Sequence, residues 1–533
     1  MKVTSRELTQ NKNVPSEDVT SATVPQKISK VGSRLLHWGR SVFRHPAFIS
    51  SLTVTGLLVV GRQLRVFEPL ELNAFDHLMQ LRPALPPDQR LLLVEVTEAD
   101  IQSYGFPIKD ALIAQLLSKL EQYEPAVMGL DMYRDIPHPP GNAELSTLLQ
   151  KSDRIIPVCK ISDPNDPGTS PPPKVPLDQV GFSDFAVDAN SYIRRALLFL
   201  DPPANSRCTS EYSFSFQLAR RYLEQKGIKP ELTSEEYLKF GKVVFKPLLP
   251  NDGGYQQVDN GGYQILLNYR SGDRLARSVT ITDVLQNRVD ASWIKDRIVL
   301  IGITAPSLKD VFYTPYSTGQ TRLEITAGLL VHGQIVSQLL STVLDERPLF
   351  WYWPEWGEGL WIWGWALVGG ILVRGVRHPL HLVLTASGAV GLLIGTSAFL
   401  FLGSGWIPVV APILGLIIAG TGVLAYNAYE AQQQKEQTEE ELRRIREKAE
   451  EQEKNIALIQ VLVKERLHQP PTTDSDTSLA EITGMADEDS DEESTTLWTQ
   501  DQVSNSQPQK RDPNFLAGRY KIDRVLGAGG FGL

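Results

Sequence analysis

The chain has 533 residues and a formal net charge of -9. Its length predicts several domains, and its acidic balance, without a basic cluster outside the flanks of apolar segments, argues against a nucleic-acid partner. Its two cysteines, Cys159 and Cys208, are too few for a disulfide framework and lack the spacing of a metal site. We expect each to be a buried thiol, with a single disulfide between them as the alternative in an oxidising compartment.

The first apolar segment predicts a membrane anchor. Residues 43–67 are long enough to cross a bilayer as a tilted helix with arginines at its ends. The preceding residues 1–42 are basic, which by the positive-inside rule predicts a cytoplasmic N-terminus. A cleaved signal peptide is the competing interpretation, but the leader is too long and no small-residue cleavage site follows.

Residues 68–350 are predicted to form one α/β domain outside the cytoplasm. Apolar runs typical of buried strands lie at residues 91–96, 126–130, 154–159, 264–268 and 297–303. Segments with helical periodicity lie between several of them, at residues 111–123, 211–225 and 329–340. Strands that alternate with helices predict a largely parallel sheet covered on both faces.

Five residues of this domain are candidates for a ligand site. Parallel sheets bind ligands beyond the carboxyl ends of their strands. Asp131 closes one predicted strand, whereas Thr304, Ser307 and Asp310 follow another, and we expect His332 to lie behind them. In the alternative interpretation the two aspartates tie loops and His332 is a hydrogen-bonded helix residue.

Three further apolar segments predict membrane helices, at residues 357–374, 379–403 and 406–426. Tryptophans around the first of them are placed as in an interfacial aromatic belt. Arg374 and Arg377 lie in the first turn and no charge lies in the second, so the C-terminus is expected in the cytoplasm. His378 and His381 share a helical spacing, but at a membrane interface we expect no metal there.

Residues 427–468 predict a cytoplasmic coiled-coil helix. Apolar residues follow a seven-residue repeat, which favours a parallel homodimer, although Lys435, Thr438 and Gln452 interrupt it. A single solvated helix is the alternative. Residues 469–513 are rich in Ser, Thr, Asp and Glu and predict a disordered acidic linker.

The order of segments over about residues 60–425 resembles the CHASE domain of the second type, an extracytoplasmic sensory module of bacterial receptors. The segments are LELNAFDHLMQLRP (70–83), LLLVEVTEADIQSYG (91–105), GLDMYRD (129–135), RIVLIGITAPSLKDVFYTPY (297–316) and GLLVHGQIVSQLL (328–340). Many members have Trp or Arg near residues 102–110, where Phe106 and Ile108 stand here. The resemblance implies a multi-pass receptor of the bacterial inner (plasma) membrane that responds to an external ligand or stimulus.

The final residues 514–533, NFLAGRYKIDRVLGAGGFGL, resemble the first strand and glycine-rich loop of bacterial serine/threonine protein kinases of the eukaryotic type. Gly527, Gly529 and Gly532 occupy the glycine places of the loop that covers the ATP phosphates. The resemblance implies ATP, Mg²⁺ and protein substrates for a complete kinase. The later catalytic motifs are missing, so we expect the chain as given to be truncated, inactive and without a cofactor. A dinucleotide loop is the alternative, which needs a following helix and a distal acid.

Together these features predict a multi-domain membrane protein: an α/β sensor with a largely parallel sheet, four transmembrane helices, a cytoplasmic coiled-coil helix and a disordered tether. The predicted function is a receptor that relays an external stimulus to a cytoplasmic serine/threonine kinase domain. A non-catalytic receptor or scaffold is the alternative. A sensor for a nucleotide cyclase or histidine kinase is a lesser one, which the final residues disfavour.

Overall fold

A computed structural model describes residues 45–189, 191–272, 274–317, 325–466, 515–516 and 520–521. The basic N-terminal segment, the acidic linker and the three loop glycines Gly527, Gly529 and Gly532 lie outside the described residues. The chain divides into two compact units, Met1–Glu441 and Leu442–Leu533. The first unit contains the α/β domain and the apolar helices.

The α/β domain is built on a six-stranded sheet with the strand order β10-β1-β11-β2-β3-β4. The strands are β1 (Leu91–Val96), β2 (Val127–Asp131), β3 (Ile155–Cys159), β4 (Gly181–Phe182), β10 (Arg277–Thr280) and β11 (Ile298–Ile303). All neighbouring strands in this sheet are parallel, which confirms the predicted sheet type. Asp131 lies opposite Gly302, so it is at the carboxyl edge of the sheet.

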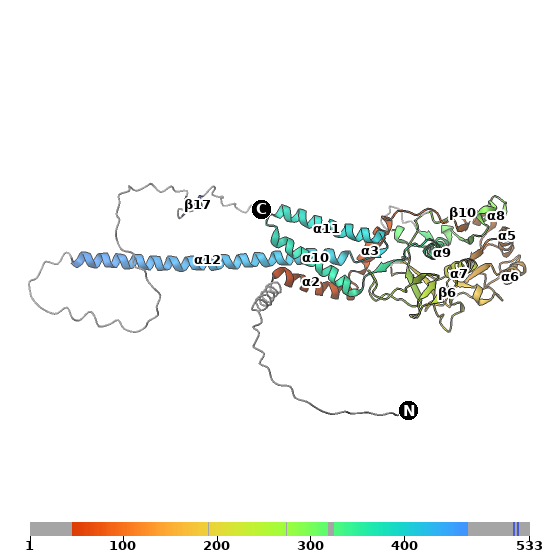
Figure 1. Cartoon of the computed structure of the whole chain (residues 1–533), viewed down its shortest axis with the longest axis horizontal. Helices are drawn as coiled ribbons and strands as arrows, with labels where there is room; N and C mark the ends of the chain where they lie inside the picture. Colours follow the sequence, from red (N-terminus) through yellow and green to blue (C-terminus); the bar gives the residue numbers. More distant parts are fainter. Residues whose placement is uncertain are drawn as a thin grey trace, which may run out of the picture. The chain divides into compact units, whose positions relative to one another are not determined.

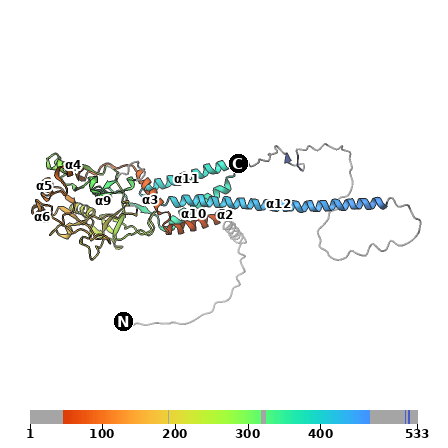
Figure 2. The same ribbon diagram turned by 180° about the vertical axis from the view of Figure 1, so that it is seen from behind.

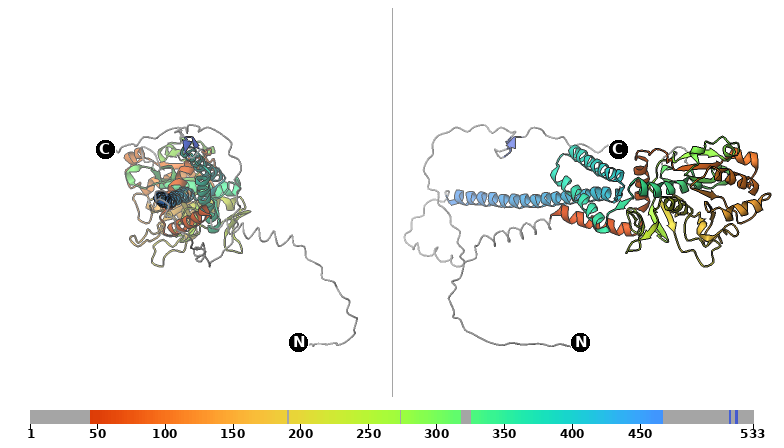
Figure 3. Two further views of the ribbon diagram at one scale, coloured as in Figure 1. Left: turned by 90° about the vertical axis from the view of Figure 1, so that its left-hand side faces the viewer. Right: turned by 45° about the vertical axis from the view of Figure 1, so that its right-hand side comes forward.

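Helices cover both faces of the sheet because its strands carry apolar side chains in both directions. Leu91 and Leu93 of β1 pack in one core with α7 (Phe214–Gln225) and α9 (Gly328–Leu344). The alternate residues Leu92 and Val94 pack in a second core with α5 (Asp110–Glu121), α6 (Asn142–Lys151) and α8 (Ile281–Leu285). In Figure 1, α5, α6 and α8 lie together, apart from α7 and α9, and Figure 3 gives two further directions of view.

Smaller elements complete the domain. The short helices are α4 (Glu98–Tyr104) and the 3₁₀ turns η1 (Leu177–Gln179), η2 (Ala291–Trp293), η3 (Pro306–Leu308) and η4 (Pro315–Ser317). The other strands are β5 (Arg195–Phe199), β6 (Pro230–Leu232), β7 (Leu238–Phe240), β8 (Val243–Phe245), β9 (Tyr263–Leu266), β12 (Val311–Phe312) and β13 (Thr326–Ala327). Residues 264–268 are therefore not a strand of the main sheet as predicted, because β9 pairs antiparallel with β5.

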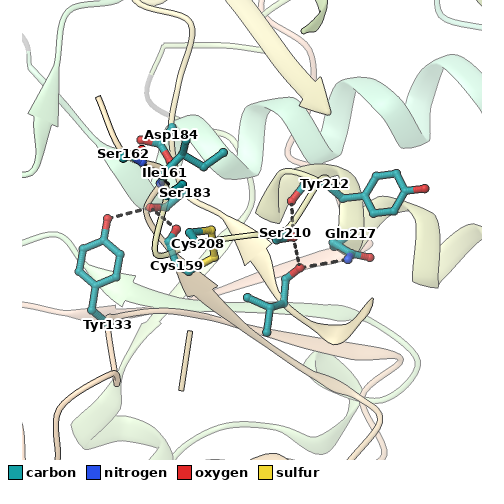
Figure 4. The surroundings of a disulfide bond; sticks show 12 residues. Tyr133, Cys159, Ile161, Ser162, Ser183, Asp184, Cys208, Ser210, Tyr212 and Gln217 are labelled. Atoms are coloured by element: carbon teal, nitrogen blue, oxygen red, sulfur yellow. Dashed lines mark hydrogen bonds between the residues drawn. A yellow bond between two sulfur atoms is a disulfide. The ribbon is translucent and has the colours of Figure 1, made fainter. Parts of the chain in front are cut away.

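The two cysteines form a disulfide, which corrects the expectation of buried thiols. Cys159 ends β3 and Cys208 lies in the loop ahead of α7, 49 residues along the chain. Figure 4 shows the bond beside Ser183, whose backbone N–H donates to the Cys159 carbonyl oxygen at 2.9 Å. A disulfide agrees with a domain that lies outside the reducing cytoplasm.

Five helices form the apolar part of the first unit or extend from it: α2 (Pro46–Gln63), α3 (Glu68–Gln80), α10 (Glu355–Gly375), α11 (Pro379–Leu402) and α12 (Val410–Arg466). Within the described residues, α11 and α12 are long and apolar enough to cross a membrane, and α2 with α3 makes a third candidate bent by 87°. Helix α10, predicted as a span, does not reach this level of hydropathy because tryptophans, glycines and charged residues interrupt its apolar run.

Close contacts hold α2 and α10 against α12 (Figures 1 and 2). The Ser50 hydroxyl of α2 donates to the Ala419 carbonyl oxygen at 3.1 Å. A Cβ atom on Gly369 of α10 would lie 2.0 Å from the Leu416 oxygen, so only glycine allows this approach. Small residues at such contacts are typical of helices packed in a bilayer. The strands β14 (Trp351–Tyr352) and β15 (Gly405–Trp406) pair just before α10 and α12.

The second unit contains the end of α12 and a short pair of strands, β16 (Phe515–Leu516) and β17 (Tyr520–Lys521), which are antiparallel. Residues predicted to form the coiled-coil seam in this unit are exposed in the single chain: Leu442, Ile445, Ile456, Ile459 and Val463. The helix itself agrees with the prediction for residues 427–468 as far as it is described.

Candidate functional site

A cavity of about 940 Å³ lies at the carboxyl edge of the parallel sheet. Its walls include Asp131 at the end of β2, Lys160 directly after β3 and Ile303 at the end of β11. Gly328 and His332 from the start of α9 close it from behind. A cavity of this size accommodates a small-molecule ligand, and this edge is where parallel sheets commonly bind one.

The structure brings together three of the five predicted ligand residues. Asp131, Asp310 and His332 line the cavity, whereas Thr304 and Ser307 do not. The Thr304 hydroxyl donates to a carboxylate oxygen of Glu95 at 3.2 Å, and the Ser307 backbone N–H donates to Glu98 at 2.8 Å. These two residues tie the loop after β11 to its neighbours, so we remove them from the candidate site.

His332 forms part of the wall and is held in one position. Its side chain is buried, and its Nδ1 atom lies 2.8 Å from the Ser215 hydroxyl. The imidazole also packs against Phe185, with ring centroids 4.3 Å apart. Burial lowers the pKa of His332 to about 3, so the ring is neutral at ordinary pH. For this residue the structural interpretation, a hydrogen-bonded helix histidine, is correct.

Asp131 and Asp310 differ from His332 because their carboxylates have no partner among the described residues. Neither side chain makes a hydrogen bond or an ion pair there. Burial, and after it the nearby Asp310 carboxylate, raise the pKa of Asp131 to about 8. Burial also raises the pKa of Asp310. The two aspartates therefore do not tie loops through their side chains, and they present acidic groups to the cavity.

Asp310 is brought to the cavity by its neighbours in the chain. Lys309 has a left-handed backbone conformation, with φ of 57°, which turns the chain after η3. The Asp310 carboxylate then lies against Gly328, where a Cβ atom would be 2.7 Å from Oδ2. Because Gly328 has no side chain, the Asp310 carboxylate can lie directly against the start of α9.

Several cavity residues escape the sequence analysis. They are Phe106, Tyr133, Arg134, Lys160, Ser183, Asp184, Phe185 and Phe312. The Tyr133 hydroxyl lies 2.8 Å from the Ser183 hydroxyl (Figure 4), and burial raises the pKa of Tyr133, so the phenol stays neutral. Strand-end reasoning applied to β3 finds Lys160, but β4 has only two residues and gives no periodic signal that points to Asp184 or Phe185.

A family model described as CHASE2 domain matches residues 53–371, more than half of the chain. The chain belongs to the CHASE2 family. No curated protein and no solved structure matches it significantly. CHASE2 domains are sensory domains of the extracytoplasmic type, so membership agrees with a signal receptor. The match ends at residue 371, so the resemblance of residues 514–533 to a kinase stays a prediction.

The CHASE2 domain has a second cavity of about 900 Å³, next to Phe199 of β5 and Tyr263 of β9. Its wall is aromatic: Phe199 stacks on Tyr263 with centroids 4.4 Å apart, and Tyr212 stacks on Phe216 at 5.4 Å. The cation in this wall, Arg220, already pairs with Glu224 at 2.9 Å. We take the sheet-edge cavity as the candidate site because it lies at the carboxyl ends of the parallel strands, where Asp131 and Asp310 have no side-chain partner among the described residues.

Within the described part of the CHASE2 protein, no group of three or more His, Cys, Asp or Glu side chains is arranged to hold a metal ion. The rings of His378 and His381 lie 5.0 Å apart without an acidic or cysteine ligand in such a group.

Proposed function

We propose that the protein is a transmembrane receptor whose CHASE2 domain binds a small ligand outside the cytoplasm and transmits the signal through α12. The observation that carries this proposal is the attachment of the domain to that helix. The Glu71 carboxylate of α3 accepts hydrogen bonds from the backbone N–H groups of Val409, Val410 and Ala411, at 2.9, 2.9 and 3.1 Å. These are the free donors at the start of α12, and an acidic group there also suits the helix dipole.

Packing supports the same attachment. Trp406, which precedes α12, is buried against Phe75 of α3 with ring centroids 4.7 Å apart. Its indole also fills the space over Gly253 and Gly254, where Cβ atoms would lie 2.3 and 2.5 Å from the ring. The start of α12 is therefore fixed to the CHASE2 domain by both a carboxylate and an aromatic side chain.

A buried ionic network links the cavity to α3. The cavity residue Val187 precedes Asp188, whose carboxylate accepts from Arg194 at 2.7 Å and from Tyr255 at 2.9 Å. Arg194 also makes two hydrogen bonds to Asp76 of α3, at 2.7 and 2.6 Å. A ligand that moves the segment around Val187 can thus shift α3, which carries Glu71. This network is the route that we propose for the signal.

In this proposal the anchor helix and three later helices cross a bacterial plasma membrane, with both termini in the cytoplasm. The basic N-terminal segment and the pair Arg374 and Arg377 support that orientation. The disulfide Cys159–Cys208 supports an external CHASE2 domain.

We further propose that α12 delivers the signal to a serine/threonine kinase domain that uses ATP and Mg²⁺. The resemblance of residues 514–533 to the start of such a domain supports this. The alternative, a non-catalytic receptor or scaffold, is distinguished by the genomic sequence downstream of the glycine-rich loop. A V-A-I-K motif and an H-R-D motif there, in frame or shifted, favour the kinase.

Thiol labelling of intact cells tests the receptor topology. The native cysteines are joined in a disulfide, so an introduced cysteine is the free thiol. We expect a membrane-impermeant maleimide to label Asn165→Cys, an exposed position of the CHASE2 domain, and to label Ser490→Cys in the acidic linker only after the cells are lysed. The reverse pattern contradicts the proposed function.

A further inference from the structure

We propose that the sheet-edge cavity binds a small organic cation, whose ammonium group lies between Asp131 and Asp310 and against aromatic rings. This inference rests on the proposed function in one respect, because it takes this cavity as the ligand site of the receptor. It adds the chemical class of the ligand.

The charges of the cavity wall are the first argument. Four aspartates and two cationic side chains line it: Asp131, Asp166, Asp184, Asp310, Arg134 and Lys160. Both cations are already paired, Arg134 with Asp110 outside the wall at 3.5 Å and Lys160 with Asp166. His332 is neutral. Asp131 and Asp310 are therefore left without a cationic partner among the described residues, and a cationic ligand favours their ionised forms.

The position of the two unpaired carboxylates is the second argument. Asp131 and Asp310 come from different elements and face one cavity, where each raises the cost of ionising the other. Asp131 is partly buried and Asp310 is exposed to the cavity. A carboxylate that has lost part of its hydration and accepts no hydrogen bond is not compensated for that loss. An ammonium group supplies both positive charge and N–H donors, whereas a neutral polyol leaves the repulsion between the two carboxylates in place.

Aromatic side chains are the third argument. Phe106, Tyr133, Phe185 and Phe312 line the same cavity, and the rings of Phe185 and Phe312 lie 5.1 Å apart, edge to face. The faces of such rings attract organic cations, most strongly where water is excluded. Carboxylates and ring faces together are therefore complementary to an amine with an aliphatic body.

A divalent metal ion fits the described residues less well. Calcium takes six to eight oxygen ligands and magnesium six, but no group of three or more His, Cys, Asp or Glu side chains within the described ranges is arranged for a metal. An anionic ligand is disfavoured by the same carboxylates that attract a cation.

Binding can be tested on the full chain in nanodiscs with three matched probes of four-carbon length. They are putrescine, its neutral counterpart 1,4-butanediol and its anionic counterpart succinate, with tetramethylammonium and MgCl₂ as further probes at constant ionic strength. We expect putrescine and tetramethylammonium to raise the thermal unfolding temperature, and the diol, succinate and Mg²⁺ to leave it unchanged.

Variants locate the binding. Asp131→Asn and Asp310→Asn are each expected to weaken putrescine binding about tenfold or more, as loss of a charged hydrogen bond does. Both remove a repulsion, so we expect them to fold. Asp153→Asn, an exposed carboxylate outside the cavity, is the matched control and is expected to bind as the unaltered protein does. Phe312→Leu is expected to weaken tetramethylammonium binding several-fold through loss of a ring face.

Four outcomes overturn the proposal: no response to either ammonium probe, an equal response to 1,4-butanediol, selective binding of succinate or Mg²⁺, or full putrescine affinity in both aspartate variants. The topology experiment is independent of these. If Asn165→Cys is labelled from outside and no ammonium probe binds, only the ligand class is wrong. If labelling shows an internal domain, the receptor proposal fails whichever probe binds.

Discussion

At the scale of single residues, the two unpaired carboxylates make the stability of the protein depend on pH. Burial raises the pKa of Asp131 from 3.8 to about 8. A carboxyl group whose pKa is higher in the folded state favours folding in its protonated form. Its contribution to stability is therefore complete below 3.8 and is lost as the pH rises through about 8.

We predict that, as the pH rises from about 5 to about 9, the Asp131→Asn variant loses less free energy of unfolding than the unaltered protein, because asparagine cannot ionise. The difference at the upper end should be about 1–3 kcal/mol, as for other buried polar groups without a partner. Thermal unfolding of the full chain without ligand, measured across this pH range, gives the comparison. Asp153→Asn should keep the original pH dependence, and the prediction is wrong if Asp131→Asn keeps it as well.

Four of the residues around this cavity whose pKa is raised or lowered by the fold, together with Asp310, do not reverse the expected sign. His332 and Tyr133 stay neutral in this range because burial lowers the pKa of the first and raises that of the second. The hydrogen bond to Asp166 raises the pKa of Lys160, which keeps its charge. Burial raises the pKa values of Asp184 and Asp310 too, so both act in the same direction as Asp131.

The candidate site shows what a sequence can and cannot reveal about single residues. Asp131 was predictable because the last residue of a buried parallel strand lies at the binding edge. Thr304, Ser307 and Asp310 all follow another strand, yet only Asp310, the farthest of the three from its end, reaches the cavity. The difference comes from the left-handed turn at Lys309 and the space above Gly328, and neither has a signal in the order of residues.

At the scale of elements, the joint between α3 and α12 depends on one side chain. Glu71 accepts hydrogen bonds from three backbone N–H groups at the start of α12. Arg62 of α2 lies nearby, and its guanidinium donates to Glu358 of α10 at 2.6 Å and to the Gly253 carbonyl oxygen at 3.1 Å. The first turn of α12 is thereby held by the CHASE2 domain.

We predict that Glu71→Ala frees this turn. The three amides lose their acceptor, at a cost of about 1–3 kcal/mol for unsatisfied buried groups. Hydrogen exchange followed by mass spectrometry should show faster exchange in a peptide that covers residues 409–411, while β1 and β11 in the sheet stay protected. Glu68→Ala is a suitable control on the same helix, because Glu68 pairs with the half-exposed Arg65 and makes no bond to α12. Unchanged exchange at residues 409–411 contradicts the assigned role of Glu71.

The positions of strands with long apolar runs could be predicted from the sequence. Which strand each of them pairs with could not. The runs at residues 91–96 and 297–303 correspond closely to β1 and β11, because buried parallel strands must be apolar on both faces. The run at 264–268 is also apolar, but β9 pairs with β5 outside the main sheet. A short run shows that a strand is buried without showing which strand lies beside it.

At the scale of the whole molecule, the family was accessible from the sequence. Of the four predicted membrane spans, two, or three if α2 and α3 form one bent span, are long and apolar enough among the described residues. The CHASE2 match covers the predicted sensor and reaches into α10. Helix α10 falls short in hydropathy yet packs so closely on α12 that Gly369 is required. Hydropathy measures a helix alone, while a helix in a bundle needs fewer apolar residues toward its neighbours.

In the proposed receptor, α12 acts on a cytoplasmic partner, and its seam of apolar residues favours a second copy of the same helix. Ile445 and Ile459 are 61% and 59% exposed in the single chain and belong to the same seven-residue repeat. In a parallel two-stranded coiled coil, each seam residue faces its own counterpart in the partner helix. A dimer of this kind lets two CHASE2 domains turn or shift one pair of helices together.

We predict that Ile445→Cys forms a disulfide between two copies when membranes are oxidised, because seam positions of a parallel pair bring their Cβ atoms within disulfide range. Glu447→Cys is the matched control, two residues away on the outer face of the same helix, and should give much less cross-linking. The native cysteines do not interfere, since both are already bonded within the chain. Non-reducing electrophoresis reports the outcome as a band of double mass. If both variants cross-link equally, or if neither does, the helix is a single solvated one. In that case α12 of one chain must transmit the signal without a partner helix.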